Sequence, residues 1–376
     1  MKFFHLSDLH IGLRLYEHSM LDEQEYILNQ IVDLAAREEV DGVLIAGDIY
    51  DKSVPPASAT VVFDTFLTRL AGLEIPVYLI SVNHDSAERI SFGAELMRRR
   101  GVYISRPYEG AVEPISLTDA YGELDLYLLP YIRPSDVRSA HEGCEAATFH
   151  DAVAYAIAQM PMREGVRRVI LTHQFLLGAS LGGSEETISV GGTDAVGADL
   201  YAPFDYVAAG HIHSPQSVTR PTVRYSGTPL AYSFSENSMK KSITVVELLE
   251  KGSVKLSEIP LIPRRPLLTL EGSFDKLISP EFRETINTDA FFEIHLIDGE
   301  QVLDASVILS RYYPNTLHVM NKNRAETEDF EILAREEKTP MEYLEELYRI
   351  QNGAELDAAA HLVFSEMMRE VWEVES

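Results

Sequence analysis

Side chains that bind divalent metals or transfer protons gather at five separate places in the sequence. In chain order these places are Ser7-Asp8-Leu9-His10, Gly47-Asp48, Asn83-His84-Asp85, Thr172-His173 and Gly210-His211-Ile212-His213. A set of oxygen and nitrogen ligands without a thiolate disfavours a structural zinc site and suits Mn²⁺, Fe²⁺ or Zn²⁺ in a catalytic role. One such group alone would mean little, because Asn and Asp are ordinary turn residues. Their recurrence calls for a common explanation.

All five groups stand at the end of an apolar run that is typical of a buried strand. The expected strands are Lys2–Leu6, Val40–Ala46, Val77–Ser81, Arg168–Thr172 and Phe204–Ala209. In open α/β sheets, ligands bind at the carboxyl ends of the strands. Asp8 and His10 are two residues apart, as are His211 and His213, so in extended backbone each pair would point to one side. The pattern therefore predicts one metal-binding site at the strand ends.

The candidate ligands exceed what a single ion needs. They are Asp8, His10, Asp48, Asn83, His173, His211 and His213. This number suits two ions that share a bridging carboxylate. Metal pairs about 3.5–4 Å apart hydrolyse phosphate esters, because one activates water and both stabilise charge on the phosphoryl oxygens. A histidine that is not a ligand can then protonate the leaving oxygen.

The segments between these strands show helical patterns. Helices are expected over Asp22–Arg37, Ala57–Leu70, Ala87–Arg100 and Phe149–Met160, and a further strand over Leu124–Leu129. Strands that alternate with helices favour a layered α/β core. A Gly- and Ser-rich segment between His173 and Phe204 is long for a connection, and such loops are usually functional or mobile.

The C-terminal third has a different character. Pro260–Pro266 is dense in proline and marks a boundary, after which Leu267–Met320 reads as a small α+β unit. Thr339–Glu342 forms a capping box with Pro at the first helical position, so a helix should begin there and break at Asn352-Gly353. A second amphipathic helix should follow. This hairpin either packs on its own domain or docks a partner's helices, and its terminal position favours docking.

Composition limits the class of protein. The chain has 376 residues, 45% of them hydrophobic, and its length suits two to three domains. It has one cysteine, no apolar run long enough to cross a bilayer and no signal peptide, which predicts a cytoplasmic protein. The net charge of −27 argues against general coating of nucleic acid by this chain alone. Residues 326–376 hold fifteen acids and four bases, a balance of −11.

The five short motifs resemble those of the calcineurin-like metallophosphoesterases. The longer strings HLSDLHIG, LIAGDIYD, THQFLLGAS, SVGGTDAVGADLYAPFDYVAAGHIHSPQ and YSGTPLAYSFSE resemble one branch of them, the nuclease subunits of SbcCD-type DNA double-strand-break repair complexes. The resemblance covers roughly residues 1–250 by motif and the remainder by architecture.

The resemblance implies a role for each candidate residue. One ion would be held by Asp8, His10, Asp48 and His213. The other would be held by Asp48, Asn83, His173 and His211. Asp48 would bridge the two ions, His84 would assist the leaving group, and both metals would be Mn²⁺.

The resemblance also implies an architecture and partners. The fold would be a layered α/β/β/α core with a nuclease domain over 1–260, a capping domain that shapes DNA access over 267–325, and a helical hairpin over 339–376. The hairpin would dock a coiled-coil ATPase subunit. The substrate would be DNA, cut as an exonuclease at duplex ends and as an endonuclease in single strands or hairpins. A homodimer would form through Ala57–Leu70 and Ala87–Arg100.

One residue departs from the family pattern. Val82 precedes Asn83-His84-Asp85 where the family usually has glycine. If that place needs a positive φ, Val82 strains the loop and impairs the site; if only space is needed, the change is tolerated. Two other hypotheses stay open: an enzyme of the same superfamily that acts on small phosphodiesters or phosphoproteins, and a non-enzymatic scaffold whose metal site has decayed.

Overall fold

The computed structural model describes residues 1–82, 93–180, 195–237, 239–298, 302, 304–322 and 361. Three predictions fall partly or wholly outside these ranges. They concern Asn83 and His84, most of the long Gly- and Ser-rich segment, and the C-terminal hairpin over 339–376.

The described chain alternates strands and helices, as the sequence pattern predicts. The helices are α1 (Leu21–Arg37), α2 (Ala57–Gly72), α4 (Ala94–Arg98), α5 (Pro134–Ala140), α6 (Phe149–Ala158), α7 (Phe274–Ile278), α8 (Pro280–Arg283) and α9 (Ala305–Tyr312), with 3-10 turns η1 (Ala198–Tyr201) and η2 (Phe234–Glu236). The strands up to the long loop are β1 (Lys2–Leu6), β2 (Arg14–Leu15), β3 (His18–Ser19), β4 (Gly42–Ile45), β5 (Val77–Leu79), β6 (Val102–Ile104), β7 (Ile115–Asp119), β8 (Gly122–Leu128) and β9 (Arg167–Thr172). The later strands are β10 (Tyr206–Ala209), β11 (Gln216–Val218), β12 (Arg220–Tyr225), β13 (Ser242–Leu248), β14 (Val254–Pro260), β15 (Leu267–Gly272), β16 (Phe291–Leu296) and β17 (Thr316–Asn321).

Two six-stranded sheets form the core of the first 260 residues. Their strand orders are β14-β13-β1-β4-β5-β6 and β11-β12-β10-β9-β8-β7. The central strands β1, β4 and β5 run parallel in the first sheet, and β8, β9 and β10 run parallel in the second. All the predicted strands that precede metal-binding motifs therefore run parallel to their predicted neighbours in one sheet or the other.

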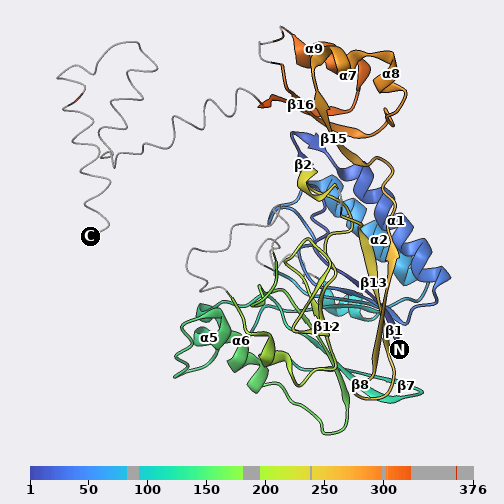
Figure 1. The fold of residues 1–376 in the computed structure, drawn as a ribbon. Helices are drawn as coiled ribbons and strands as arrows, with labels where there is room; N and C mark the ends of the chain where they lie inside the picture. The colour runs from blue at the N-terminus through green and yellow to red at the C-terminus, as the bar shows by residue number, and fades with distance from the viewer. Residues whose placement is uncertain are drawn as a thin grey trace.

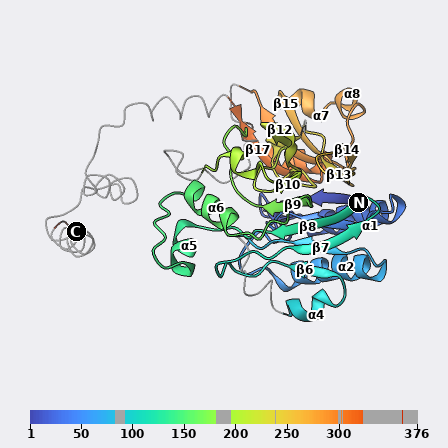
Figure 2. The same cartoon turned by 90° about the horizontal axis from the view of Figure 1, so that it is seen from below.

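Alternating side chains of these strands divide the core into three layers. In β1, Phe4 and Leu6 pack with α1 and α2, whereas Phe3 faces the second sheet. In β9, Ile170 packs with α5 and α6, whereas Val169 faces the first sheet. Because successive strand residues point to opposite faces, strands covered on both sides read as continuous apolar runs. The predicted α/β/β/α layering is confirmed, with α1 and α2 on one side of the core and α5 and α6 on the other (Figures 1 and 2).

Residues 267–322 form a separate α+β unit, as predicted. Its three parallel strands have the order β15-β16-β17, and α7 and α9 pack on one face around Phe292, Leu309 and Tyr313. The unit lies at one end of the core, beside α1 and the β2–β3 hairpin (Figure 1).

A buried acid joins this α+β unit to the core. Glu23 of α1 accepts hydrogen bonds from Arg264 at 2.8 Å and from Arg265 at 2.7 Å, and Arg265 also pairs with Asp289. A small apolar cluster that includes Phe291 supports the same junction. The proline-dense segment is therefore fixed to α1 by charge-assisted hydrogen bonds.

The predicted helix over Ala87–Arg100 is only partly described. Within the described residues, α4 covers Ala94–Arg98, and Gly101 follows it with a φ of 83°. Among the described helices, none is long and apolar enough to cross a membrane.

Candidate metal centre

Side chains from both sheets meet at the carboxyl ends of their strands. Asp8 and His10 follow β1, Asp48 follows β4, His173 follows β9, and His213 follows β10. All five are buried, although they come from residues far apart in the chain. The structure therefore brings together five of the candidate ligands.

One group consists of Asp8, His10 and His213, whose ligand atoms all lie within 4.8 Å of one another. The Nε2 atoms of His10 and His213 are 3.2 Å apart and so face the same point. One carboxylate and two imidazoles at this separation can hold a divalent ion.

A second group shares Asp8 with the first and adds Asp48 and His173, again within 4.8 Å. His173 Nε2 lies 3.2 Å from Asp48 Oδ2 and 4.0 Å from Asp8 Oδ1. Asp48 Oδ2 is also 3.7 Å from His10 Nε2. Both carboxylates thus lie between the two groups, and adjoining groups that share ligands suit a pair of ions.

The other predicted site residues have different positions. The His211 ring centroid lies 5.4 Å from that of His173, and the His211 backbone N–H donates to Asp8 Oδ1 at 2.9 Å. The His211 imidazole belongs to neither three-residue group. Asn83 and His84 lie outside the described residues.

The backbone at these ligands is not extended, contrary to the reasoning from two-residue spacing. Asp8, His10 and Asp48 have φ values of 53°, 43° and 48°, and His211 has 103°. The shared direction of Asp8 and His10 therefore comes from tight left-handed turns and not from strand pleating. Left-handed backbone at residues other than glycine costs free energy and is concentrated at functional sites.

Two glycines allow the chain to pass close to His173. A Cβ at Gly47 would lie 2.7 Å from His173 Nδ1, and a Cβ at Gly210 would lie 2.7 Å from the same atom and 2.0 Å from Ala46 O. His173 Nδ1 donates to Ala46 O at 2.7 Å. This bond fixes the tautomer, so that Nε2 presents its lone pair to the two carboxylates.

Burial and charge strongly perturb the site. Burial raises the pKa of Asp8, partly against the nearby His173 and His213. Burial alone would lower the pKa of His173, but the carboxylates of Asp48 and Asp8 outweigh it and raise that pKa to about 9. Asp8 Oδ2 and His173 Nε2 are buried and make no hydrogen bond within the described part of the chain. Buried acceptors without donors fit a bound cation.

Val82 fits the structure without a special backbone. It is 4% exposed, and it is not among the described residues with positive φ. Its Cγ1 atom fills the space beside Gly47, where an added Cβ would come within 2.3 Å of it. The described structure therefore supports the alternative in which only space matters at this position.

Residues 225–241 hold the site from behind, a role that the ligand motifs did not reveal. Tyr232 packs its ring against His10 and donates to the carbonyl of Leu9, and Gln24 donates to the carbonyl of His10 at 2.7 Å. Glu236 and Lys241 lie behind His213. The signal was present in the string YSGTPLAYSFSE, whose individual residues carry no metal-binding pattern.

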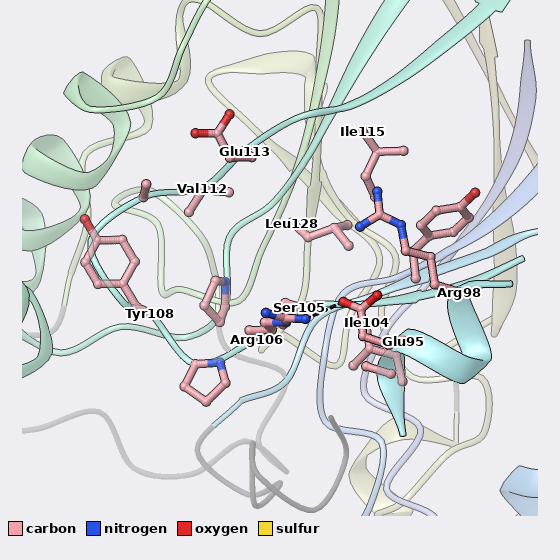
Figure 3. Close-up of a pocket in the computed structure, with 15 residues that line it drawn as sticks. Glu95, Arg98, Ile104, Ser105, Arg106, Tyr108, Val112, Glu113, Ile115 and Leu128 are labelled. Atoms are coloured by element: carbon pink, nitrogen blue, oxygen red, sulfur yellow. Dashed lines mark hydrogen bonds and ion pairs between the residues drawn. The ribbon is translucent and has the colours of Figure 1, made fainter. Parts of the chain in front are cut away.

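Two hollows border the described strands beyond the metal centre. One of about 350 Å³ lies between α4, β6 and β8, and Arg106 pairs there with Glu95 (Figure 3). It contains none of the candidate ligands. The other, of about 570 Å³, is lined by Ser81, Val82, Tyr131 and Arg133 and therefore begins at the end of β5.

Comparison with known proteins defines the class. The calcineurin-like phosphoesterase family matches residues 1–215, more than half of the chain, and the chain belongs to this family. It is therefore a metal-dependent phosphoesterase. A second family, described as the type 5 capsule protein repressor C-terminal domain, matches residues 263–352.

A particular relative extends the likeness to nearly the whole chain. The chain is 28% identical over 352 residues to SbcD, the smaller component of the nuclease SbcCD of Staphylococcus epidermidis, in a match that covers 93% of both proteins. Solved structures are more distant. A dimetal phosphatase from Danio rerio is 12% identical with a TM-score of 0.38, covering 70% of this chain and 97% of that one. The Yfce phosphoesterase from E. coli is 13% identical with a TM-score of 0.28, covering 70% and 100%.

Proposed function

We propose that the chain is the nuclease subunit of an SbcCD-type complex, which hydrolyses phosphodiester bonds of DNA with Mn²⁺ at the site formed by the two sheets. The observation that carries the proposal is the convergence of Asp8, His10, Asp48, His173 and His213 on adjoining points in a buried pocket. The named relative supports the substrate class, because its likeness covers 93% of this chain.

The proposal assigns two Mn²⁺ ions to seven residues. The first ion would take Asp8, His10, Asp48 and His213, and the second would take Asp48, Asn83, His173 and His211, with Asp48 shared. Bound divalent metals supply Lewis acidity toward phosphoryl oxygens and lower the pKa of water. Oxygen and nitrogen donors without thiolate fit Mn²⁺.

The chain's own groups orient the ligands and move the proton. Ala46 O holds the His173 ring, and the His211 backbone N–H holds the carboxylate of Asp8. Burial of these carboxylates strengthens their attraction for cations, because water screens them poorly. In the proposal His84 donates the proton that the leaving oxygen needs.

The domain organisation follows the same proposal. Residues 1–260 would be the nuclease domain, 267–325 the capping domain that shapes DNA access, and 339–376 the helical hairpin that docks an SbcC-type coiled-coil ATPase. The Glu23 junction supports a capping unit held at a fixed place on the core. The hollow lined by Tyr131 and Arg133 provides a basic, aromatic surface beside the site, as polynucleotides require.

The remaining parts of the proposal concern assembly and context. The chain would act on duplex ends as an exonuclease and on single strands or hairpins as an endonuclease, in DNA repair, recombination and replication. It would form a homodimer through helices of the nuclease domain. Because its net charge is −27, much of the DNA grip would come from the partner. The cytoplasmic location stays a prediction.

A cleavage assay tests the proposal. Linear duplex, hairpin DNA and a small phosphodiester are incubated with the protein and Mn²⁺, with and without the coiled-coil ATPase. Asp48→Ala and His84→Ala should each abolish at least about 99% of DNA cleavage, because general acid and metal contributions are each worth about 10²-fold or more. The control Asp64→Ala, at an exposed position of α2, should keep wild-type activity.

The outcomes separate the hypotheses. Metal-dependent cleavage of the small diester without any DNA cleavage, even with the ATPase, would replace the nuclease with a small-molecule phosphodiesterase. Equal cleavage by wild type, Asp48→Ala and His84→Ala would show contamination and remove support for this site. Metal binding without hydrolysis of any ester would favour an impaired scaffold.

A further inference from the structure

The string YSGTPLAYSFSE contains none of the seven proposed ligands, yet its residues surround His213. Thr228 N–H donates to His213 O at 3.1 Å. Gly227 passes so close that a Cβ there would lie 2.6 Å from the same carbonyl oxygen. This part of the string therefore fixes the backbone of His213.

The end of the string faces the His213 ring. Its Nε2 is directed at His10, 3.2 Å from the Nε2 of that residue. Its other nitrogen, Nδ1, lies 4.0 Å from Oε1 of Glu236. The two ring nitrogens thus have different partners, with the metal centre on one side and a carboxylate on the other.

Glu236 is itself held by a buried cation. Its side chain is fully buried, and Oε2 lies 2.5 Å from Nζ of Lys241, which is 7% exposed. The same ammonium donates to Thr228 Oγ1 at 2.6 Å and to His213 O at 3.1 Å. Lys241 therefore ties the carboxylate and the His213 backbone to one point.

We propose that Glu236 is a positioning residue for His213, with Lys241 as the group that holds it in place. The carboxylate accepts the Nδ1–H of His213, which fixes the tautomer and leaves the Nε2 lone pair free for a metal. Carboxylates behind ligand histidines orient the ring and raise its basicity. This inference rests on the proposed metal site.

The cost of the arrangement argues that it does more than fill space. Two charges have been taken out of water, and apolar residues of similar volume often replace such a pair without loss of stability. A carboxylate that faces a ligand histidine gives the pair a use that apolar residues could not supply. A purely structural pair would not need Oε1 to face the imidazole.

Metal affinity distinguishes positioning from stability. Mn²⁺ binding to the full-length protein is measured by calorimetry after chelation and dialysis, with thermal unfolding of the metal-free protein beside it. Glu236→Gln should weaken binding about 10–100-fold. The matched control is Asp125→Asn, which removes another buried carboxylate with a cationic partner, Arg163, away from the candidate ligands. It should leave the affinity unchanged.

A double variant deals with loss of folding. Glu236→Gln alone leaves Lys241 buried without its carboxylate, so the pair Glu236→Gln with Lys241→Met removes both charges. If Glu236 positions His213, the double variant folds but binds Mn²⁺ as weakly as the single variant. Wild-type affinity in either folded variant would overturn the proposal and leave the pair a structural role.

The wild-type protein supplies an independent readout. With Zn²⁺ as a diamagnetic substitute, ¹⁵N spectra of labelled histidine should show His213 with a protonated Nδ1 and a metal-bound Nε2, assigned by comparison with His213→Asn. The reverse tautomer would overturn the proposal whether or not the variants fold. Wild type that binds no divalent metal would instead refute the metal site itself, whereas metal binding without DNA cleavage would count only against the proposed substrate.

Discussion

Gly47 is the position where one added methyl group should disturb the metal centre most directly. Its φ of 88° lies in the left-handed region, and its Cα faces both Val82 and His173. An alanine Cβ would lie 2.3 Å from Val82 Cγ1 and 2.7 Å from His173 Nδ1. Both distances are shorter than real Cβ contacts allow, so Gly47→Ala must move at least one neighbour.

The expected loss of stability has two sources. Left-handed backbone at alanine costs about 1–2 kcal/mol, and overpacking of a tight core costs about 1–3 kcal/mol. Gly47→Ala should therefore lower the free energy of unfolding by roughly 2–5 kcal/mol. It should also weaken metal binding, because the clash at His173 Nδ1 competes with the bond to Ala46 O that orients this ring.

A second substitution separates the two clashes. Val82→Ala removes the Cγ1 atom and with it the 2.3 Å contact, but it leaves the contact with His173. Relative to Gly47→Ala, the double variant should recover part of the unfolding free energy in urea, measured without metal. It should recover none of the Mn²⁺ affinity measured by calorimetry. Wild-type affinity in folded Gly47→Ala would refute the view that this glycine protects the His173 geometry.

Three further predictions concern protons and the domain junction. Because the pKa of His173 is about 9, Mn²⁺ binding near pH 7 should release about one proton from this site and tighten as the pH rises toward 9; calorimetry in buffers of different ionisation enthalpy would show no such release if His173 were neutral. Burial alone would raise the pKa of Asp119, but Arg167 and the N-terminal ammonium lower it to about 2, so its contribution to stability should be lost as the pH falls from about 4 to 2, and Asp119→Asn should flatten urea unfolding over that range. Glu23→Gln should lower the free energy of unfolding by about 1–3 kcal/mol, discounted for its partly exposed arginine partners, and speed proteolysis near Arg264; unchanged proteolysis would show that the junction does not depend on this charge.

The sequence predicted the elements that position the site more closely than the site's own backbone. Lys2–Leu6 is a strand as expected, and the helix predicted over Asp22–Arg37 covers Leu21–Arg37. Strands covered on both faces leave a continuous apolar run, which periodicity readily detects. Left-handed turns at Asp8 and His10 leave no such pattern, because their conformation is imposed by the contacts around them.

Support for the ligands was harder to predict than the ligands themselves. Asp and His at strand ends stand out because few other roles explain them there. Glu236 and Lys241 lie in irregular chain and at a strand start, where an acid or a base is ordinary. Their pairing depends on a five-residue separation across η2 and β13 that only the folded chain reveals. Residues that act through other residues carry little chemistry in their own local sequence.

The origin of the candidate ligands in two separate sheets has a mechanical consequence. A cation held by Asp8 and His213 would close a chain loop of about two hundred residues and staple one sheet to the other. Chelation should then do more than stop turnover: it should loosen the seam between the sheets and make heat unfolding less cooperative. In this sense the ions would serve as late-added rivets of the fold, and scarcity of metal would be felt as fragility of the whole nuclease.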